Sequence, residues 1–501
     1  MSEQKNEAME AQSLSELLQV RREKLKELQE SGNDPYRITK YVADCDSKHI
    51  HENFEVMEGK QVSLAGRMMS KRGMGKVTFC DLQDSTGRIQ MYARSDELGE
   101  EVFETFKKYD IGDILGVEGE VFLTKRGEQS IRLTAVTLLA KSLIPLPEKF
   151  HGLTDKETRY RQRYVDLIVN PEVRRTFEIR SQFITYLRRF LDSRGYIEVD
   201  TPVLNTISGG ASARPFITHH NTLDLDMYMR IATELHLKRL IVGGMDRVYE
   251  VGRLFRNEGM DPKHNPEFTT VEWYQAYANY EDMMDMFEAM LSGAAQEILG
   301  TTQISWLGHE IDLTPNWPRM TMAEAVKQHT GADFMACSTD EEAAAEAKKL
   351  GVEFDGKNGK DATWGNLLYE CFDRFVEEKL IQPVFITKHP VDVSPLAKRS
   401  PEDERLTDRF ELFIAKCEIC NAFSELNDPI DQRTRFQRQA DLRSRGDDEA
   451  SMMDEDFLHA LEYGMPPTGG LGAGIDRIVM LLTNSDSIRD VLLFPTMKPL
   501  D

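Results

Sequence analysis

One stretch in the middle of the chain, residues 248–274, constrains the fold more than any other: VYEVGRLFRNEGMDPKHNPEFTTVEWY. Apolar and polar side chains alternate near its two ends, 248–256 and 267–274, and a polar segment with two prolines separates them. This pattern predicts two antiparallel strands joined by a loop. Side chains two positions apart share one face of a strand. That face would present a guanidinium, two carboxylates, a phenyl ring and a phenol: Arg256, Glu258, Phe268, Glu272 and Tyr274.

These side chains suit a ligand that carries both phosphate and positive charge. An arginine can bind phosphate through two parallel hydrogen bonds, and a phenyl ring can stack on a nucleotide base. Paired carboxylates can bind an ammonium group or a metal ion. The alternative is a solvent-exposed hairpin with ordinary ion pairs between its strands. The residue types alone favour neither interpretation.

The composition of the whole chain narrows its class. With 501 residues, 40% of them hydrophobic and 29% charged, it is expected to be a globular protein of several domains. Neither a membrane span of about 18 apolar residues nor a secretion signal is predicted, so a cytoplasmic location is expected. The net charge of −23 argues against indiscriminate nucleic-acid binding but allows a locally basic RNA site. Six scattered cysteines predict no disulfide framework.

Residues 59–142 predict a small β-barrel. Five alternating runs, with a helical stretch between the third and the fourth, follow the order of an OB-fold, which commonly binds single-stranded nucleic acid. A basic cluster at 67–76 precedes Phe79 and Gln90. Phe79 is either a base-stacking side chain or part of the barrel core. A helix with a basic face is predicted at 13–30, and this face is either solvated or in contact with RNA.

The second half of the chain alternates helices and strands. A long helix from Asn170 precedes a strand at 197–202 that contains a proline at its end. A loop of small residues follows at 208–216, and Glu234 lies near the start of the next helix. A polar helical stretch at about 320–381 is predicted to be an inserted subdomain.

Three motifs resemble those of one enzyme family. FRNEG followed by HNPEFT resembles motif 2 of the class II aminoacyl-tRNA synthetases, and the EWY after it is similar to the bacterial, lysine-specific branch of subclass IIb. The helix, strand and proline at 170–202 resemble motif 1, which forms the dimer interface in this family. The run GGLGAGIDR at 469–477, which opens an apolar helix, resembles motif 3; glycines and a helix N-terminus suit an anion. The resemblance covers residues 13–498.

The resemblance implies an α+β fold, with an OB-fold barrel followed by an antiparallel sheet flanked by helices. The implied activity is the activation of L-lysine with ATP to lysyl-adenylate and transfer of lysine to the 3′ end of tRNA(Lys). A cytoplasmic homodimer without a membrane partner is expected. The implied domains are an N-terminal helical extension (1–58), an OB-fold anticodon-binding domain (59–142), a linker (143–169), and a catalytic domain (170–501) with a helical insertion at about 320–381.

The resemblance also implies roles for individual residues. Arg256 and Arg477 would be catalytic, and Glu411 and Glu418 would bind Mg2+. The expected ATP-binding residues are Arg256, Glu258, His264, Asn265, Phe268, Glu411, Glu418 and Arg477. The expected lysine-binding residues are Gly210, Glu234, Arg256, Glu272, Tyr274, Asn421, Phe423, Glu425 and Gly472. The expected anticodon-binding residues are Lys71, Arg72, Phe79 and Gln90.

The chain departs from the family pattern at a few positions. The family often has arginine at the position of Lys71, so two-pronged binding there is in doubt. It usually has proline where Thr233 stands, and glycine where Cys420 and Ala422 stand. The two missing glycines predict a slightly displaced backbone near residue 421.

Three other functions stay open. The first is an aspartyl- or asparaginyl-type synthetase; the acid-rich pocket, which suits a side-chain ammonium group, and the GGASA loop argue against it. The second is a ligase that attaches lysine to a protein, but such relatives lack an anticodon domain. The third is a non-catalytic, synthetase-like RNA-binding protein. The chain retains four charged residues that catalysis would need, which argues against a non-catalytic protein: Arg256, Glu411, Glu418 and Arg477.

Overall fold

The chain folds into two compact units, Met1–Thr154 and Asp155–Asp501, and each is described by itself. The structure is a computed structural model that describes residues 2–147, 153–353, 361–446 and 450–500, with the backbone alone for 2–13. Within these ranges, every helix is too short or too polar to cross a membrane. The predicted division into a helical extension, an OB-fold domain, a linker and a catalytic domain stays a prediction.

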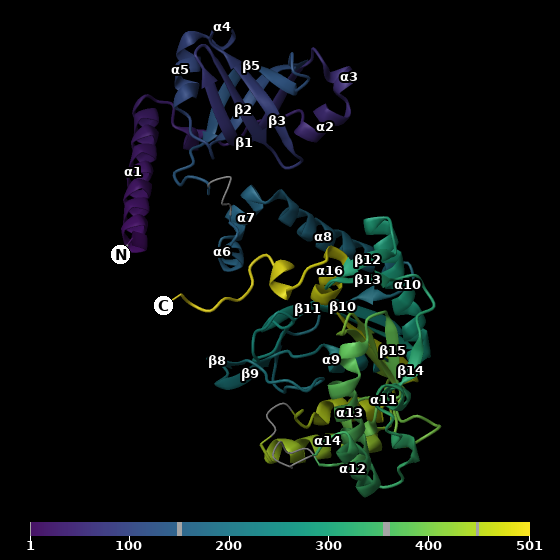
Figure 1. The fold of residues 1–501 in the computed structure, drawn as a ribbon. Helices are drawn as coiled ribbons and strands as arrows, with labels where there is room; N and C mark the ends of the chain where they lie inside the picture. Colours follow the sequence, from purple (N-terminus) through teal and green to yellow (C-terminus); the bar gives the residue numbers. More distant parts are fainter. Residues whose placement is uncertain (1, 148–152, 354–360, 447–449, 501) are drawn as a thin grey trace. The chain divides into compact units, whose positions relative to one another are not determined.

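The first unit is a closed barrel with the strand order β1-β2-β3-β5-β4 (Figure 1). Its core consists of alternate side chains from the strands, such as Leu64, Met91 and Val117. Phe79 is half-buried and lies outside this core. The OB-fold is thereby confirmed. The elements are β1 (Gln61–Met74), β2 (Val77–Gln83), β3 (Arg88–Arg94), α4 (Ser95–Leu98), α5 (Glu100–Lys108), β4 (Ile114–Leu123) and β5 (Gln129–Ala140), preceded by the short helices η1 (Pro35–Arg37), α2 (Ser47–Glu52) and α3 (Phe54–Met57).

Helix α1 (Ser2–Glu30) begins earlier than predicted and is attached to the barrel by its basic side chains. Arg21 is buried and donates hydrogen bonds to the backbone oxygens of Ile111 and Ser142, each at 3.0 Å. Lys24 Nζ lies 2.6 Å from Asp110 Oδ1. The predicted solvated role is therefore wrong for Arg21, which is buried against the barrel, and the contact of this helix with RNA stays a prediction.

The second unit is built on an eight-stranded sheet with the order β14-β15-β16-β17-β18-β11-β10-β6. The strands from β15 to β10 are antiparallel, and only the two edge strands, β14 and β6, pair in parallel. The predicted antiparallel sheet is therefore confirmed except at its edges. The strands are β6 (Ile197–Glu198), β10 (Arg247–Phe255), β11 (Glu267–Ala276), β14 (Arg319–Thr321), β15 (Val384–Thr387), β16 (Arg409–Ile414), β17 (Cys417–Ser424) and β18 (Thr468–Gly474).

Helices cover both faces of this sheet. On one face, α8 (Pro171–Asp192), α10 (Tyr280–Leu299) and α16 (Ile475–Thr483) bury the main core, which includes Val271 and Trp273 of β11. On the other face, α9 (Glu234–Val242), α14 (Pro429–Ser444) and α15 (Glu455–Glu462) pack around Val248 and Tyr274. The odd-numbered residues of β11 therefore face the core, and the even-numbered ones face the site described below.

The predicted helical stretch near 320–381 contains α11 (Met322–Thr330), α12 (Asp340–Lys349) and α13 (Trp364–Phe375). These helices gather beside the β14–β15 edge of the sheet (Figure 1) and form a second core. The strand predicted at 197–202 is shorter, because regular pairing ends at Glu198, four positions before the proline. The other elements are α6 (Lys156–Arg161), α7 (Arg163–Val169), β7 (Leu204–Asn205), β8 (Ile217–His220), β9 (Leu225–Met229), β12 (Gln303–Trp306), β13 (His309–Asp312), η2 (Phe334–Ala336), η3 (Glu377–Lys379), η4 (Val391–Val393) and η5 (Ile488–Asp490).

Candidate active site

The strand register places the candidate residues in two rows on one face of the sheet. In the first row Glu272 pairs with Gly472, Gly472 with Asn421, and Asn421 with Glu411. In the second row Tyr274, Gly470, Phe423 and Arg409 are paired in the same way across β11, β18, β17 and β16. Because paired residues on neighbouring strands point to the same side, these side chains form one surface.

Glycines in β18 leave space between the larger side chains. A Cβ atom at Gly470 would overlap the Glu425 carboxylate and the Tyr274 ring. A Cβ atom at Gly472 would meet only Glu272 Cγ, at an ordinary 3.5 Å. Gly470 is therefore required by the packing of the protein itself, whereas the space above Gly472 is open to a ligand.

Glu418 reaches this face through an irregularity in β17. Leu412 pairs with Cys420 but Phe413 pairs with Glu418, so the register skips Ile419. A residue without a partner in a strand reverses the alternation beyond it. Glu418 and Asn421 are consequently both partly exposed although they lie an odd number of residues apart.

The positions of the missing glycines lie on the opposite side of β17. Cys420 and Ala422 are buried in the main core, whereas Asn421 and Phe423 face the site. From Cys420 to Ser424 the strand pairs with β18 in continuous register. The pairing with β18 is thus regular and the irregularity of β17 faces β16, while the predicted slight displacement of the backbone stays a prediction.

Three carboxylates, those of Glu234, Glu272 and Glu425, lie buried together. Burial and the nearby charge of Glu234 raise the pKa of Glu272 to about 7. Its Oε2 accepts a hydrogen bond from the Tyr274 hydroxyl and its Oε1 one from the backbone N–H of Thr233, each at 3.2 Å. Glu272 therefore has neutral hydrogen-bond donors in the structure.

Thr233, the position where the family usually has proline, belongs to this cluster. Its backbone N–H is the donor to Glu272, and a proline has no such group. Its side chain is almost fully buried and makes no capping bond to α9, and its hydroxyl has no hydrogen-bond partner. This departure from the family pattern adds a backbone hydrogen bond to the central carboxylate.

Lys238 also lies among the carboxylates, and sequence reasoning missed it. Its Nζ donates a hydrogen bond of 2.5 Å to Glu234 Oε1 and forms an ion pair with Glu425. The side chain is fully buried, with Nζ 5.3 Å from the centre of the Phe423 ring. The signal was present in the sequence, since Glu234 and Lys238 are four residues apart on one helix.

The turn after β10 places a second group of residues beside the carboxylates. The Arg256 guanidinium lies 5.2 Å from the centre of the Phe268 ring, and its Nε is buried without a hydrogen-bond partner. Burial lowers the pKa of Arg256. Such an arginine, close to an aromatic ring, is suited to an anionic ligand that carries a flat base.

The expected motif 3 arginine reaches the same region. Arg477 donates a hydrogen bond of 2.7 Å to the backbone oxygen of Glu418 and lies 3.3 Å from His264 Nε2. His264 is held by Asp261, and Asn265 bonds the backbone oxygen of Glu267 through its side-chain nitrogen. The buried Oδ1 of Asn265 has no partner. Glu258 follows Arg256 and is exposed.

The two expected magnesium ligands each lie next to an arginine. Arg409 binds Glu411 Oε1 at 2.6 Å and Asn421 Oδ1 at 3.0 Å, and sequence reasoning did not assign it a role. Arg477 lies 3.4 Å from Glu418 Oε2. In the described part of the chain no three acidic, histidine or cysteine side chains are grouped to hold a metal alone. Two carboxylates do fit Mg2+ that takes its remaining ligands from phosphates and water.

The loop of small residues passes over the carboxylates. Gly210 has a φ of +88°, and a Cβ there would lie 3.0 Å from Ala232. The segment after residue 449 holds the loop, because Ser451 Oγ donates to the backbone oxygen of Ala211 at 3.2 Å. Gly210 is thereby placed close to the start of α9, where Glu234 lies.

In the barrel, the expected anticodon residues divide into two groups. Arg72 is exposed and pairs with Phe79, whose ring lies 5.0 Å from that of Tyr92. Gln90 accepts a hydrogen bond from Ser130 Oγ at 3.1 Å. Lys71 differs, because its Nζ donates to three backbone oxygens at the end of α5, at 2.6–3.1 Å. An RNA contact by Lys71 would have to displace these bonds.

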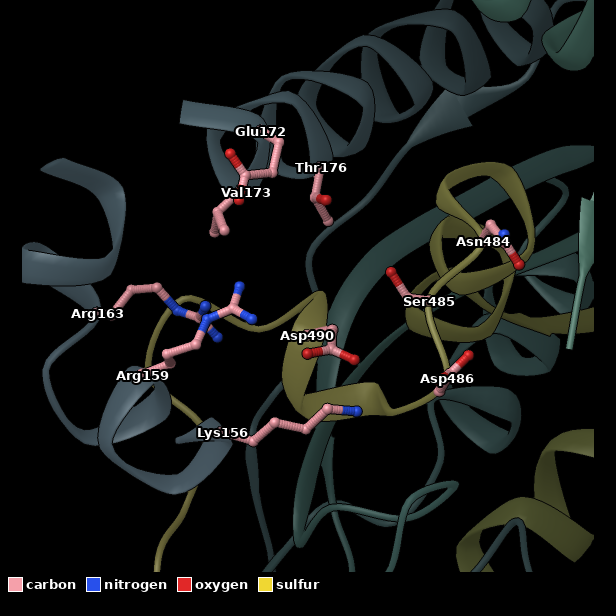
Figure 2. A pocket seen from close by; sticks show the side chains of 10 residues that line it. All are labelled: Lys156, Arg159, Arg163, Glu172, Val173, Thr176, Asn484, Ser485, Asp486 and Asp490. Carbon is pink, nitrogen blue, oxygen red and sulfur yellow. The ribbon is translucent and has the colours of Figure 1, made fainter. Parts of the chain in front are cut away.

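A separate polar hollow of about 230 Å³ lies between α6, α7, the start of α8 and the residues around η5 (Figure 2). Arg159 and Arg163, which line it, both bind Asp166. Asp490 on its wall accepts a hydrogen bond from Tyr160. Its two arginines are thus paired within the protein, and its lining includes none of the expected site residues.

Both units match families of known proteins. Residues 155–498 match the family described as tRNA synthetases class II (D, K and N), and residues 62–139 match the OB-fold nucleic acid binding domain. The chain is 57% identical over 490 residues to a lysine–tRNA ligase of Pelotomaculum thermopropionicum, covering 97% of this chain and 96% of that protein. It is 56% identical to lysine–tRNA ligases of Halalkalibacterium halodurans (97% of this chain, 98% of that protein) and Moorella thermoacetica (98% and 99%).

Proposed function

The chain belongs to the class II tRNA synthetases, and we propose that its three buried carboxylates bind L-lysine for ATP-dependent ligation to tRNA. The activity is that of a lysine–tRNA ligase. The single observation that carries the assignment of the pocket is the cluster of Glu234, Glu272 and Glu425, because buried carboxylates need cationic partners. An aspartate- or asparagine-specific pocket would not need this excess of acid.

The first chemical step requires no enzyme base. The lysine carboxylate is already ionised, and it attacks the α-phosphorus of ATP with pyrophosphate as the leaving group. Arg256 would bind the α-phosphate and the attacking carboxylate together, which orients them and offsets the charge of the transition state. Phe268 would stack on adenine, and Glu258 would accept a hydrogen bond from the adenine amino group. Arg477 would bind the γ-phosphate.

The remaining groups recognise lysine and the metal. Glu234 would take the α-ammonium, while Glu272, Glu425 and the Tyr274 hydroxyl would take the side-chain ammonium. Glu411 and Glu418 would hold Mg2+, which would supply positive charge that offsets the charge of the phosphates. In the second step a ribose hydroxyl at the 3′ end of tRNA attacks the acyl carbon of lysyl-adenylate and releases AMP.

We further propose a cytoplasmic homodimer. The edge strand β6 pairs on one side only, and Ile197 on it is 53% exposed. An apolar side chain on an open strand edge supports an interface at this position.

The test of the function is amino-acid-dependent exchange of pyrophosphate into ATP, run with each of the twenty amino acids in the absence of tRNA. Exchange with lysine alone is expected. Exchange with aspartate or asparagine would keep the reaction but refute the pocket assignment. Failure to exchange with any amino acid, in a protein that still binds RNA, would favour a non-catalytic RNA-binding function.

Lysine activation is expected to depend on pH through Glu272. Its pKa of about 7 means that the carboxylate is increasingly protonated below neutrality, and the protonated form lacks the charge that attracts ammonium. The KM for lysine should therefore rise as pH falls from 8 to 6, by up to about tenfold per unit below the pKa, while the KM for ATP changes less. A flat lysine profile would show that Glu272 does not control binding.

Gly472→Ala tests the space above the sheet. The added methyl group makes only an ordinary contact in the protein, so the free energy of unfolding should change little. It projects between Glu272 and Asn421, and the KM for lysine is expected to rise by about tenfold through overpacking against the ligand. Gly73→Ala, in an uncrowded part of the barrel, is the control in the same exchange assay.

Phe79→Ala tests the tRNA side. Loss of a stacking ring costs about 1–3 kcal/mol per base, so the KM for tRNA in aminoacylation should rise by roughly tenfold or more. Pyrophosphate exchange without tRNA should stay at the wild-type rate. A variant with normal tRNA kinetics would remove Phe79 from the interface.

A further inference from the structure

The acidic pocket contains a cation of its own. Lys238 projects from α9 with no exposed side-chain surface, and Glu234 and Glu425 contact its ammonium group. Burial by itself would lower the pKa of Lys238, but these two carboxylates raise it above the usual value. The ring of Phe423 on one side and that of Phe457 on the other, at 5.3 and 6.0 Å, complete its surroundings. Lys238 is therefore a charged and fixed part of the pocket.

Lys238 does not compensate all the carboxylates. It contacts Glu234 and Glu425, whereas Glu272 is bonded by the neutral groups of Thr233 and Tyr274. When all three carboxylates are ionised, their three negative charges against the one positive charge of Lys238 leave an excess of two. Free lysine carries two ammonium groups, and its carboxylate is assigned to Arg256. The two ammonium groups and Lys238 together would match the three carboxylates one for one.

We propose that Lys238 is a resident counter-ion that determines the specificity of this pocket for an amino acid with two ammonium groups. It cancels one of the three carboxylates, so that a ligand with a single ammonium group leaves a buried carboxylate unpaired, which is costly. It also fixes Glu425, with which it forms an ion pair, in place for the incoming side chain. This inference rests on the proposed lysine site, in which Lys238 acts as a positioning residue.

The neighbouring Arg239 provides a matched control. It lies on the same helix, but its guanidinium binds Asp454 and Asp456 instead of the pocket carboxylates. Lys238→Met keeps the unbranched stem and removes the charge, and Arg239→Met makes the same kind of change outside the pocket.

The first experiment measures pyrophosphate exchange by both variants with lysine and with 2-aminoheptanoic acid, which has a methyl group where lysine has its side-chain ammonium. Lys238→Met is expected to raise the KM for lysine by at least about tenfold, with the KM for ATP within about twofold of wild type. Because Glu425 is then no longer held in place for the side-chain ammonium, the preference for lysine over 2-aminoheptanoic acid should fall by a similar factor. Arg239→Met should keep the wild-type preference.

The second experiment is chemical rescue. Lys238→Ala leaves a space beside Glu425 into which a small amine fits, so methylammonium should restore part of the lysine-dependent exchange. In the wild-type enzyme the same amine should only compete with lysine. Equal loss of lysine and ATP binding in Lys238→Met, or no rescue of Lys238→Ala, would show that Lys238 is merely structural and overturn the inference. A wild-type enzyme that fails to exchange with lysine would instead refute the proposed function itself.

Discussion

Replacement of Arg256 by glutamine is expected to lower kcat/KM for lysine-dependent pyrophosphate exchange by about a hundred- to a thousandfold. Arg256 follows β10 at the turn of the hairpin, and its Nε is buried with no partner. An unpaired buried donor is costly in the free protein and becomes bonded when a phosphate arrives. Glutamine keeps a hydrogen-bonding group but has neither the charge nor the two-pronged geometry.

The loss should fall mainly on kcat, because charge accumulates on the phosphate oxygens in the transition state. Arg253→Gln is the control, since Arg253 lies three residues earlier, on β10, is half exposed and forms an ion pair with Glu267. Its exchange kinetics should match wild type. Arg256→Gln activity within a few fold of wild type would exclude Arg256 from phosphate binding.

The hairpin of residues 248–274 shows why so much of the site was predictable. Alternation fixes which residues of a strand share a face, and Glu272 and Tyr274 are indeed on one face of β11. The pairing of Glu272 with Gly472 joins strands about two hundred residues apart in the sequence, and the pairing of Gly472 with Asn421 adds a third strand. No local pattern encodes that register, and only the resemblance to a known family brought these residues together before the structure.

The local sequence pattern did not predict the roles of basic residues whose surroundings are set by tertiary contacts. Lys238 reads as an ordinary basic residue on an amphipathic helix, and its burial follows from Glu425, which comes from a different strand. Lys71 reads as part of a basic RNA-binding cluster, yet it binds the carbonyl groups at the end of α5. A basic side chain gives the same sequence signal whether it faces solvent, RNA or a helix C-terminus.

The substitution Glu272→Gln separates recognition of the lysine side chain from every other property of the pocket. A charge-assisted hydrogen bond to a buried ammonium group is lost, and the KM for lysine is expected to rise by roughly a hundredfold. The KM for ATP should stay within about threefold, because the hydrogen bonds of Glu272 are to Thr233 and Tyr274, and neither of these is assigned to the nucleotide. Glutamine can still accept a hydrogen bond from either of these donors, so the fold should be preserved.

In Glu272→Gln, lysine binding is expected to weaken while the free energy of unfolding does not fall. A general loss of structure would lower both. Folding raises the pKa of Glu272 from 4.5 to about 7, so its buried charge destabilises the free folded state by an amount that grows as pH rises from 4.5 to 7 and is constant above that pH. A neutral glutamine removes the cost, and at pH 8 without lysine the free energy of unfolding should equal or exceed that of wild type. The dependence of the lysine KM on pH near 7 should disappear.

Glu267→Gln, at the half-exposed start of the same strand, should alter neither property. Unchanged lysine kinetics in Glu272→Gln would remove Glu272 from the pocket, and a lysine KM that still follows a pKa near 7 would assign that titration to Glu234 or Glu425.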